Sequence, residues 1–264
     1  MPRRECGGPR FIHDRIRESP RMSDSMKTRK ILDLLDLTLL RMDASESDLA
    51  KVCEQANKHR TAAVCVFPRH AGFVRDHLEE GISMALVAGG FPRGSDSPAE
   101  IFDAVEDAVS KGADEIDCVL EPRDDNSFPG ELELAKLIAM REAAQGRILK
   151  VILEAPLLGE RQLRAATRMA LSTGADFVKS CTGQRGGCSD ETATILAEEV
   201  SRHCLSFEGE PGVKMSGGIS KRRDAERLIA LVNEEDGSIS GSGRLRIGAS
   251  SLLADLVDGG LGRN

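Results

Sequence analysis

Two lysines and one aspartate lie in apolar segments of the chain, where charged residues are unusual. Lys179 ends the segment FVK, Lys214 ends the segment GVK, and Asp117 lies within EIDCV. Buried Lys and Asp are rare unless they are paired. One interpretation is a structural ion-pair network in which the three side chains neutralise one another. On position alone, a structural network and a reactive site are about equally well supported.

The presence of a second lysine favours reactive chemistry. Two ammonium groups about 5 Å apart, in an effective dielectric near 20, repel each other by roughly 3 kcal/mol, which lowers the pKa of one amine by about 2 pH units. An amine that is partly neutral near pH 7 to 8 attacks an aldehyde to form a Schiff base. Lys179 and Lys214 together therefore predict a nucleophilic lysine activated by a cationic neighbour.

Eight short aliphatic or β-branched segments alternate with helical patterns from Ile31 onward. These candidate strands span residues 34–38, 62–67, 82–90, 113–120, 147–154, 175–180, 212–217 and 244–250. Strict alternation in a chain of 264 residues predicts an α/β protein with a single (β/α)8 TIM barrel domain, for which about 250 residues is usual. A doubly wound open sheet is the alternative. It predicts a glycine-rich fingerprint after the first strand, and LLDLTLL has none.

Helix ends are marked by short polar motifs. Ser45-x-x-Asp48 and Ser97-Pro98 each precede apolar residues at helical spacing, which predicts two capped helix starts. The tripeptide at 112–114, Gly-Ala-Asp, recurs at 174–176, where a glycine again ends a helix and a strand follows. This repeat indicates a recurring helix-to-strand unit.

Polar residues at the carboxyl ends of barrel strands are the ones to examine for function, because active sites of this fold lie there. Two small-residue loops follow the seventh and eighth strands, Ser216-Gly217-Gly218 and Gly248-Ala249-Ser250-Ser251. Barrels commonly hold phosphate at these two places, with free backbone N–H groups directed at the anion. Either motif alone could mark a simple turn, but together they favour phosphate.

Composition excludes several classes of protein. The formal charge of −7 and pI of 5.4 give no broad basic surface for nucleic acid or anionic membrane. No apolar run approaches 18 residues. Seven cysteines without CxxC pairs predict a reducing, cytoplasmic location, and five histidines without metal-ligand spacing predict no metal. Residues 1–28 lack apolar periodicity and are expected to form a disordered basic leader ahead of a barrel at 29–260.

From about Ile31 to Val257 the chain resembles the deoxyribose-phosphate aldolase family. The motifs that carry the resemblance are DLTLL (36–40), AAVCVFPR (62–69), GADEIDCV (112–119), ILKVILE (148–154), GADFVKSCTG (174–183), GVKMSGGI (212–219) and RIGASSLLA (246–254). The resemblance implies a TIM barrel that reversibly cleaves 2-deoxy-D-ribose 5-phosphate into D-glyceraldehyde 3-phosphate and acetaldehyde. It also implies a homodimer or homotetramer that needs no metal or organic cofactor.

The resemblance also assigns roles by position. Lys179 matches the Schiff-base lysine, Lys214 the lysine that lowers its pKa, and Asp117 the acid that relays protons through a bound water. Other matched positions support the site (Asp36, Lys150), line the pocket (Cys65), or contact substrate and phosphate (Thr182, Gly183, Gly217, Gly218, Ser250, Ser251). For Cys65 an apolar filler role is the alternative, and for Lys150 a structural ion pair.

The chain departs from the family pattern in three places. Ser180-Cys181-Thr182-Gly183 replaces the usual Thr-Ser-Thr-Gly, and the segment 121–131 is more acidic than expected. Some relatives end in a tail with a terminal tyrosine that aids proton transfer, and this chain has no tyrosine. An aldolase-fold protein with weak or lost activity, acting as a binding scaffold, is therefore the alternative function. Another lysine-dependent barrel aldolase, acting on a different phosphorylated sugar, is a third and weaker hypothesis.

Overall fold

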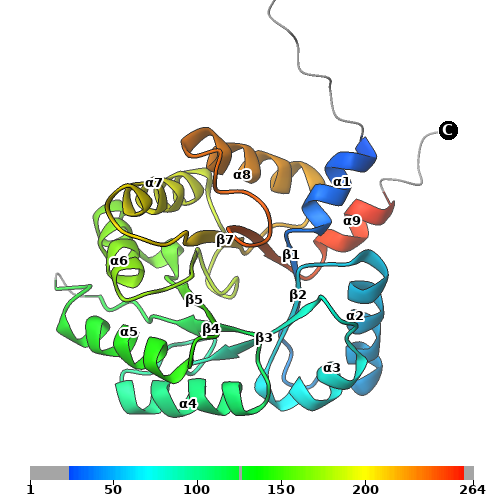
Figure 1. The fold of residues 1–264 in the computed structure, drawn as a ribbon, viewed down its shortest axis with the longest axis horizontal. Coiled ribbons are helices and arrows are strands. Elements are labelled where there is room, and N and C mark those ends of the chain that lie inside the picture. The colour runs from blue at the N-terminus through cyan, green and yellow to red at the C-terminus, as the bar shows by residue number, and fades with distance from the viewer. Residues whose placement is uncertain (1–23, 125–126, 259–264) are drawn as a thin grey trace, which may run out of the picture.

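The computed structural model describes residues 24–124 and 127–258. Its strands coincide with the eight predicted segments. They are β1 (Leu35–Leu39), β2 (Ala63–Val66), β3 (Ser83–Ala88), β4 (Glu115–Val119), β5 (Ile148–Ile152), β6 (Phe177–Lys179), β7 (Gly212–Ser216) and β8 (Leu245–Ala249). The strands pair in parallel in chain order, and β1 pairs with β8 to close the barrel (Figure 1). The predicted (β/α)8 fold is confirmed, and the open-sheet alternative is wrong.

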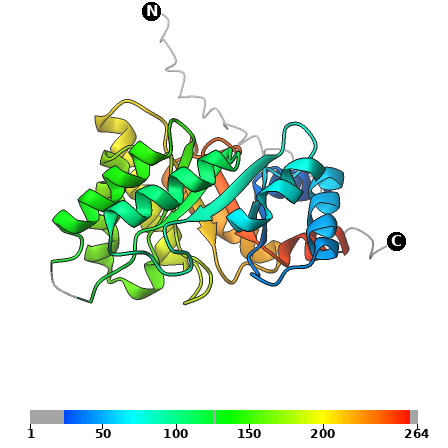
Figure 2. The same cartoon turned by 90° about the horizontal axis from the view of Figure 1, so that it is seen from below.

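Helices surround the strands, as the view from below also shows (Figure 2). They are α1 (Asp24–Leu32), α2 (Glu46–His59), α3 (Ala71–His77), α4 (Pro98–Ser110), α5 (Glu131–Ala143), α6 (Glu160–Ser172), α7 (Asp190–Ser206), α8 (Arg222–Glu235) and α9 (Leu252–Asp258), with the short 3-10 turns η1 (Pro68–His70) and η2 (Ala155–Leu157). Both predicted caps are present. The Ser45 hydroxyl and the Asp48 carboxylate form a reciprocal capping box on α2, and Ser97 caps α4 with Pro98 at its first position.

The repeated tripeptide forms the same turn twice, from α4 into β4 at 112–114 and from α6 into β6 at 174–176. The two glycines have φ of +83° and +87°, a left-handed conformation that costs glycine no steric penalty. The aspartate that ends each turn accepts a backbone hydrogen bond of 2.8 Å from the neighbouring strand, donated by Met84 of β3 or Leu149 of β5. The sequence repeat is therefore a structural repeat.

Successive residues of each strand point to opposite sides of the barrel wall. On β4, Ile116 and Cys118 belong to the main hydrophobic core between strands and helices. Glu115 and Asp117 alternate with them and are also fully buried, so they occupy the barrel interior. The wall thus separates an apolar outer core from a partly charged interior.

The first helix of the structure overlaps the end of the predicted leader. Helix α1 begins at Asp24, inside the segment 1–28 that was expected to be a disordered leader. Its last turn buries Ile31 and Leu32, which lie inside the predicted barrel segment, and the helix contacts α8. The rest of the predicted leader, residues 1–23, lies outside the described residues, as do residues 259–264.

Candidate active site

Lys179 and Lys214 lie side by side at the carboxyl-terminal half of the barrel. They are direct partners in the β6–β7 register. Lys214 is fully buried, and Lys179 is 3% exposed. Neighbouring strands lie about 4.8 Å apart, so the structure brings the two predicted lysines together as their strand positions indicated.

Asp117 lies between the two ammonium groups. Its Oδ2 accepts hydrogen bonds from Lys179 Nζ at 2.8 Å and from Lys214 Nζ at 2.6 Å. Its Oδ1 is 3.3 Å from Lys150 Nζ, but the geometry there is not that of a hydrogen bond. Burial disfavours the carboxylate, yet the three lysines outweigh burial and hold the pKa of Asp117 well below its usual range. Asp117 is an ionised acceptor.

Asp36 and Lys150 form a second buried layer beside this triad. Asp36 Oδ2 is 2.6 Å from both Lys150 Nζ and Lys214 Nζ. Burial opposes ionisation of Asp36, but the cations lower its pKa well below the usual value, and the surrounding carboxylates raise the pKa of Lys150 against burial. Both residues support the triad, and both are fully buried ion-pair partners.

Two further charged residues were missed by the sequence analysis. Arg246 of β8 donates to Asp36 Oδ1 at 2.6 Å and to Glu115 Oε1 at 2.7 Å, and Glu115 Oε2 is 2.5 Å from Lys150 Nζ. Strand periodicity could have found them, because Glu115 is two positions from Asp117 and so lies on the same side of β4. We call the connected set the charge cluster. It consists of Asp36, Glu115, Asp117, Lys150, Lys179, Lys214 and Arg246.

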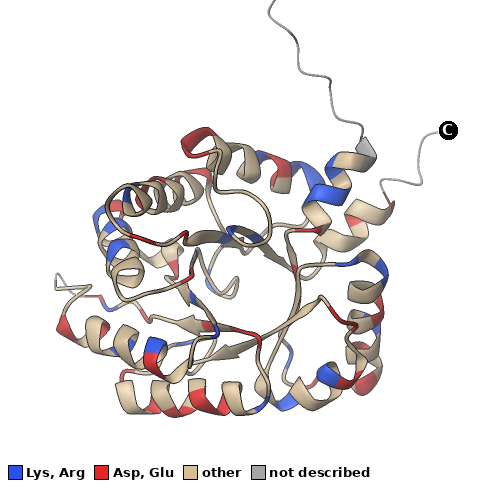
Figure 3. Cartoon of the chain, viewed as in Figure 1, with Lys and Arg blue, Asp and Glu red and all other residues tan. Residues whose placement is uncertain are grey.

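The charge cluster corrects one expectation about Lys179. Repulsion by Lys214 was expected to lower the pKa of Lys179. Burial does favour the neutral amine, but the contact with the Asp117 carboxylate outweighs it, and the pKa of Lys179 lies above its ordinary value. The fold places a carboxylate between the two cations, and repulsion between the cations alone does not account for its effect. Charged positions on the strands are visible inside the ring of helices (Figure 3).

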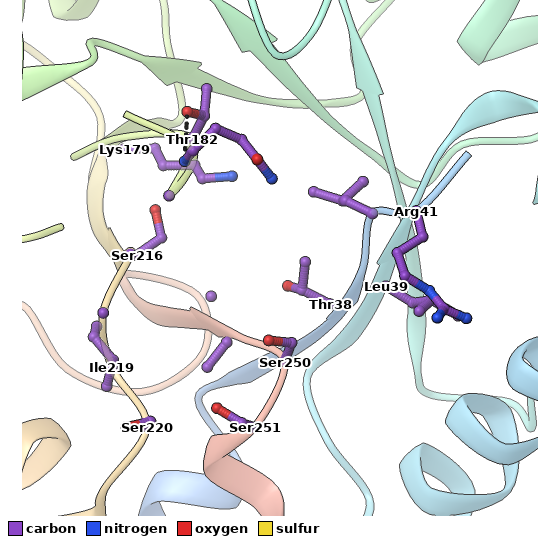
Figure 4. A pocket seen from close by; sticks show the side chains of 17 residues that line it. Thr38, Leu39, Arg41, Lys179, Thr182, Ser216, Ile219, Ser220, Ser250 and Ser251 are labelled. Atoms are coloured by element: carbon purple, nitrogen blue, oxygen red, sulfur yellow. Dashed lines mark hydrogen bonds between the residues drawn. The ribbon is translucent and has the colours of Figure 1, made fainter. Parts of the chain in front are cut away.

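A cavity of about 440 Å³ opens at the carboxyl ends of the strands. Lys179 is the one member of the charge cluster among the residues described as lining it. The predicted substrate and phosphate residues also line it, and these are Thr182, Gly183, Gly217, Gly218, Ser250 and Ser251. In Figure 4, Lys179, Thr182 and Ser216 lie on one side of the cavity, Thr38 on the other, and Ser250 and Ser251 at its edge. Asp36, Cys65 and Lys150 are buried and do not line it.

The loop after β7 needs glycine at its cavity-lining positions. Gly217 has φ of +85°, and a Cβ there would lie 2.7 Å from Cys181 Sγ. The Cys181 thiol and the Ser180 hydroxyl bind the backbone carbonyl of Ser216, at 2.9 and 3.1 Å. The replacement of Thr-Ser-Thr-Gly by Ser-Cys-Thr-Gly thus gives two side chains that tie the loop after β6 to the loop after β7.

One acidic residue of the segment 121–131, Glu121, has a basic partner in a neighbouring loop. Arg185, in the loop after β6, donates to both carboxylate oxygens of Glu121 at 2.6 and 2.8 Å and to Glu154 at 3.0 Å. Glu154 is fully buried and accepts from the Thr182 backbone N–H at 3.3 Å. These contacts connect the loops after β4, β5 and β6 beside the cavity. Loop side chains carry no periodic signal from which these contacts could have been predicted.

Cys65 is fully buried on β2, and its thiol lies 4.0 Å from Asp117 Oδ2. Burial, reinforced by that carboxylate, raises the pKa of the Cys65 thiol to about 11. The side chain packs with Ala63, Ala85 and Val87 on the inner side of β2 and β3. These observations favour the apolar filler role over a direct substrate contact.

A family model described as DeoC/LacD family aldolase matches residues 31–257. The chain belongs to this aldolase family. It is similar to the deoxyribose-phosphate aldolase of Finegoldia magna, with 32% identity over 85% of this chain and 97% of the relative. The deoxyribose-phosphate aldolase of Clostridium novyi is 34% identical over 85% of this chain and 94% of the relative. The tetrameric deoxyribose phosphate aldolase structure from Aeropyrum pernix shares the fold, with a TM-score of 0.71, 24% identity, and coverage of 89% of this chain and 92% of that chain.

Membership of the aldolase family agrees with the resemblance predicted from the motifs. Within residues 24–124 and 127–258, no helix is long and apolar enough to cross a membrane. The same residues contain no group of three or more His, Cys, Asp and Glu side chains that could hold a metal ion. The carboxylates of the charge cluster are instead bound to lysines and arginine.

Proposed function

We propose that this protein is a Schiff-base aldolase that reversibly cleaves 2-deoxy-D-ribose 5-phosphate into D-glyceraldehyde 3-phosphate and acetaldehyde. The observation that carries the proposal is the position of Lys179. Its Nζ contacts the buried acid Asp117, and its side chain reaches the cavity formed by the glycine and serine loops. We therefore assign Lys179 as the nucleophile, Asp117, which contacts it, as the proton acceptor, and the cavity loops as the anion-binding wall.

The chemistry begins with a neutral Lys179 amine, which adds to the C1 aldehyde of the open-chain sugar. The resulting carbinolamine loses water to give an iminium ion. Asp117, directly or through one water, accepts the proton of the C3 hydroxyl as the C2–C3 bond breaks. The electron pair of that bond moves into the iminium, which gives an enamine and D-glyceraldehyde 3-phosphate. Protonation at C2 and hydrolysis then release acetaldehyde and restore Lys179.

Asp117 fits the role of proton acceptor for two reasons. Its pKa is held low by the surrounding lysines, so it enters the cycle ionised. Its Oδ1 is buried 3.3 Å from Lys150 Nζ and accepts no hydrogen bond from the protein residues described, so it retains acceptor capacity for a water or hydroxyl that reaches it. The contact with Lys179 keeps the amine protonated before substrate binds, so proton transfer from Lys179 is an early step of the proposed cycle.

The opposite end of the substrate would be held by the loops after β7 and β8. Gly217 and Gly218 have φ of +85° and +74°, and Ser250 and Ser251 are exposed at the cavity edge. Backbone N–H groups of such glycine turns and serine hydroxyls are suitable donors to a phosphate. Arg41 also lines the cavity, but its guanidinium binds Asp48 at 2.5 Å. Phosphate recognition is therefore proposed to depend mainly on neutral donors.

A protein of the aldolase fold with weak or lost activity remains a second candidate. It is favoured by the tight contacts of Asp117 with Lys179 and Lys214, which also satisfy a purely structural network. Action on a different phosphorylated sugar is the third candidate. The three candidates predict different results at Lys179. The first predicts an adduct with deoxyribose 5-phosphate or acetaldehyde, the second predicts no adduct, and the third predicts an adduct with other sugar phosphates only.

The test is borohydride reduction of the folded protein in the presence of deoxyribose 5-phosphate, or of acetaldehyde, followed by peptide mass analysis. We expect a stable adduct on Lys179 and none in Lys179→Arg. Lys111→Arg is the matched control, since Lys111 is a partly exposed lysine paired with Asp107, and its adduct on Lys179 should be unchanged. A folded wild-type protein without an adduct on Lys179 would exclude the aldolase proposal. An adduct with other sugar phosphates only would select the third candidate.

The proposed enzyme is a cytoplasmic homo-oligomer. We expect a homodimer or homotetramer, the latter in line with the tetrameric relative from Aeropyrum pernix, and multi-angle light scattering gives the mass directly. We also propose a cytoplasmic enzyme. Cys53, Cys65, Cys118, Cys181, Cys188 and Cys204 are free thiols in the structure, as expected in a reducing compartment.

A further inference from the structure

Arg246 is the one arginine of the charge cluster. It is 5% exposed and does not line the cavity. Its Nη1 and Nη2 donate to Asp36 at 2.6 Å and to Glu115 at 2.7 Å, and its Nε donates to the Ser242 carbonyl at 2.5 Å. Because the guanidinium is held on three sides, its charge is fixed in place.

Arg246 determines the net charge of the cluster when one lysine loses its proton. The cluster holds three carboxylates, three lysines and Arg246. If Arg246 were absent, the three lysines would just balance the three acids, and a neutral Lys179 would leave a net negative charge in the barrel. With Arg246 present, one lysine can lose its proton and the cluster becomes neutral. Burial disfavours an uncompensated charge, so the charge of Arg246 lowers the cost of the neutral Lys179 that the reaction requires.

We propose that Arg246 is a positioning residue whose permanent charge allows Lys179 to become the neutral nucleophile while Asp36 and Asp117 stay ionised. This inference rests on the proposed Schiff-base function. Burial disfavours the guanidinium, but Asp36 and Glu115 keep the pKa of Arg246 above its ordinary value, so it remains charged at every pH at which the enzyme works. The guanidinium of arginine does not lose its proton in proteins.

Lys179 is the member that loses the proton because of its surroundings. It faces Asp117 of β4, Cys65 of β2, Lys150 of β5 and Lys214 of β7. Lys150 is bound by Asp36 and Glu115 as well as being close to Asp117, whereas Lys179 contacts one carboxylate. Lys179 also reaches the cavity, where the electrophile binds.

The distance over which Arg246 acts follows from the strand register. Lys179, Lys214 and Arg246 are consecutive partners across β6, β7 and β8. Two inter-strand steps are about 10 Å, and a unit charge at that distance in an effective dielectric near 20 moves a pKa by roughly one pH unit. The charge of Arg246 is thus close enough to be measured at Lys179.

The test compares the pH dependence of the Lys179 adduct in single-charge variants. Removal of a positive charge stabilises the Lys179 ammonium, so Arg246→Gln should move the midpoint of trapping up by roughly one pH unit. Removal of a negative charge does the reverse, so Glu115→Gln should move it down by a similar amount. Arg246→Lys keeps the charge and loses the forked contacts, and its midpoint should stay close to that of wild type.

A merely structural role predicts a different result, because lost packing lowers the amount of folded protein without moving midpoints in opposite directions. The double variant Arg246→Gln with Glu115→Gln restores the original balance and should return the midpoint toward wild type. Equal midpoints in all folded variants, or shifts of the same sign in Arg246→Gln and Glu115→Gln, would overturn the inference. If Arg246→Gln does not fold, Glu115→Gln and the double variant still decide. A wild-type protein that forms no adduct would instead refute the proposed function.

Discussion

Removal of the charge of Lys214 tests the electrostatic account of the site most directly. Lys214 and Lys179 bind the same oxygen of Asp117, at 2.6 and 2.8 Å, so their ammonium groups lie within about 5 Å of each other. At that distance and an effective dielectric near 20, the repulsion is about 3 kcal/mol. In Lys214→Met this repulsion is lost, and Asp117 Oδ2 accepts a hydrogen bond from Lys179 alone. Both changes stabilise the Lys179 ammonium.

The expected result is a rise of about 2 pH units in the midpoint of borohydride trapping at Lys179, which is roughly a hundredfold loss of neutral amine at pH 7. The assay is the yield of reduced adduct against pH, with acetaldehyde held at one concentration. The variant also leaves Asp36 and Asp117 with one partner fewer, so we expect unfolding to become easier by about 3–5 kcal/mol. The measurements must therefore be made on protein shown to be folded by circular dichroism.

Lys136→Met is the matched control. Lys136 is another fully buried lysine, but it lies on α5 and pairs with Asp96 at 2.8 Å, outside the charge cluster. Its loss should lower stability and leave the trapping midpoint unchanged. A folded Lys214→Met protein with the wild-type midpoint would refute the reasoning, because it would mean that the neighbouring cation has no influence on Lys179.

Three further predictions concern the acid, the phosphate loop and stability. Asp117→Asn should retain trapping at Lys179, with its midpoint shifted to lower pH, while turnover falls by roughly 10²–10⁴-fold; turnover within tenfold of wild type would contradict a role in proton transfer. Gly217→Ala places a Cβ 2.7 Å from Cys181 Sγ, so KM for deoxyribose 5-phosphate should rise about tenfold while kcat/KM for unphosphorylated deoxyribose changes little; equal effects on both would argue against a phosphate site. The lowered pKa values of Asp36 and Asp117 stabilise the folded state above the ordinary carboxyl pKa of about 4, and this stability is lost as pH falls through their lower folded values. Urea unfolding at pH 7 and pH 3 should show a smaller acid-dependent loss in Asp117→Asn than in wild type.

The elements and the reactive lysines could be predicted because both follow from short-range pattern. Alternating apolar runs gave the strands, and the position of Lys179 and Lys214 at the ends of consecutive strands brought them to one place. The partners of Asp36 could not be predicted in this way. Its contact with Arg246 joins positions 210 residues apart and exists only because β8 closes against β1. No local pattern specifies which lysine reaches which carboxylate.

The direction of the Lys179 pKa shift also depended on tertiary geometry. The two lysines were correctly placed, but the sign followed from the Asp117 carboxylate between them. The contact of Arg185 with Glu121 was missed for a related reason. It joins two loops 64 residues apart, and loop side chains carry no periodic signal. The direction of a pKa shift can be predicted from neighbouring charges only when all the charged neighbours of the group are known.

The repeated turns at 112–114 and 174–176 have a consequence for how this protein can change over time. They lie at the amino ends of β4 and β6, opposite the cavity, where each aspartate carboxylate accepts a partly buried hydrogen bond from a backbone N–H of the neighbouring strand. Loops at the cavity end can therefore be exchanged without breaking these hydrogen bonds. The turns that stabilise the barrel and the loops that line the cavity therefore lie at opposite ends of the strands. Libraries that vary only the cavity loops should retain a high fraction of folded members.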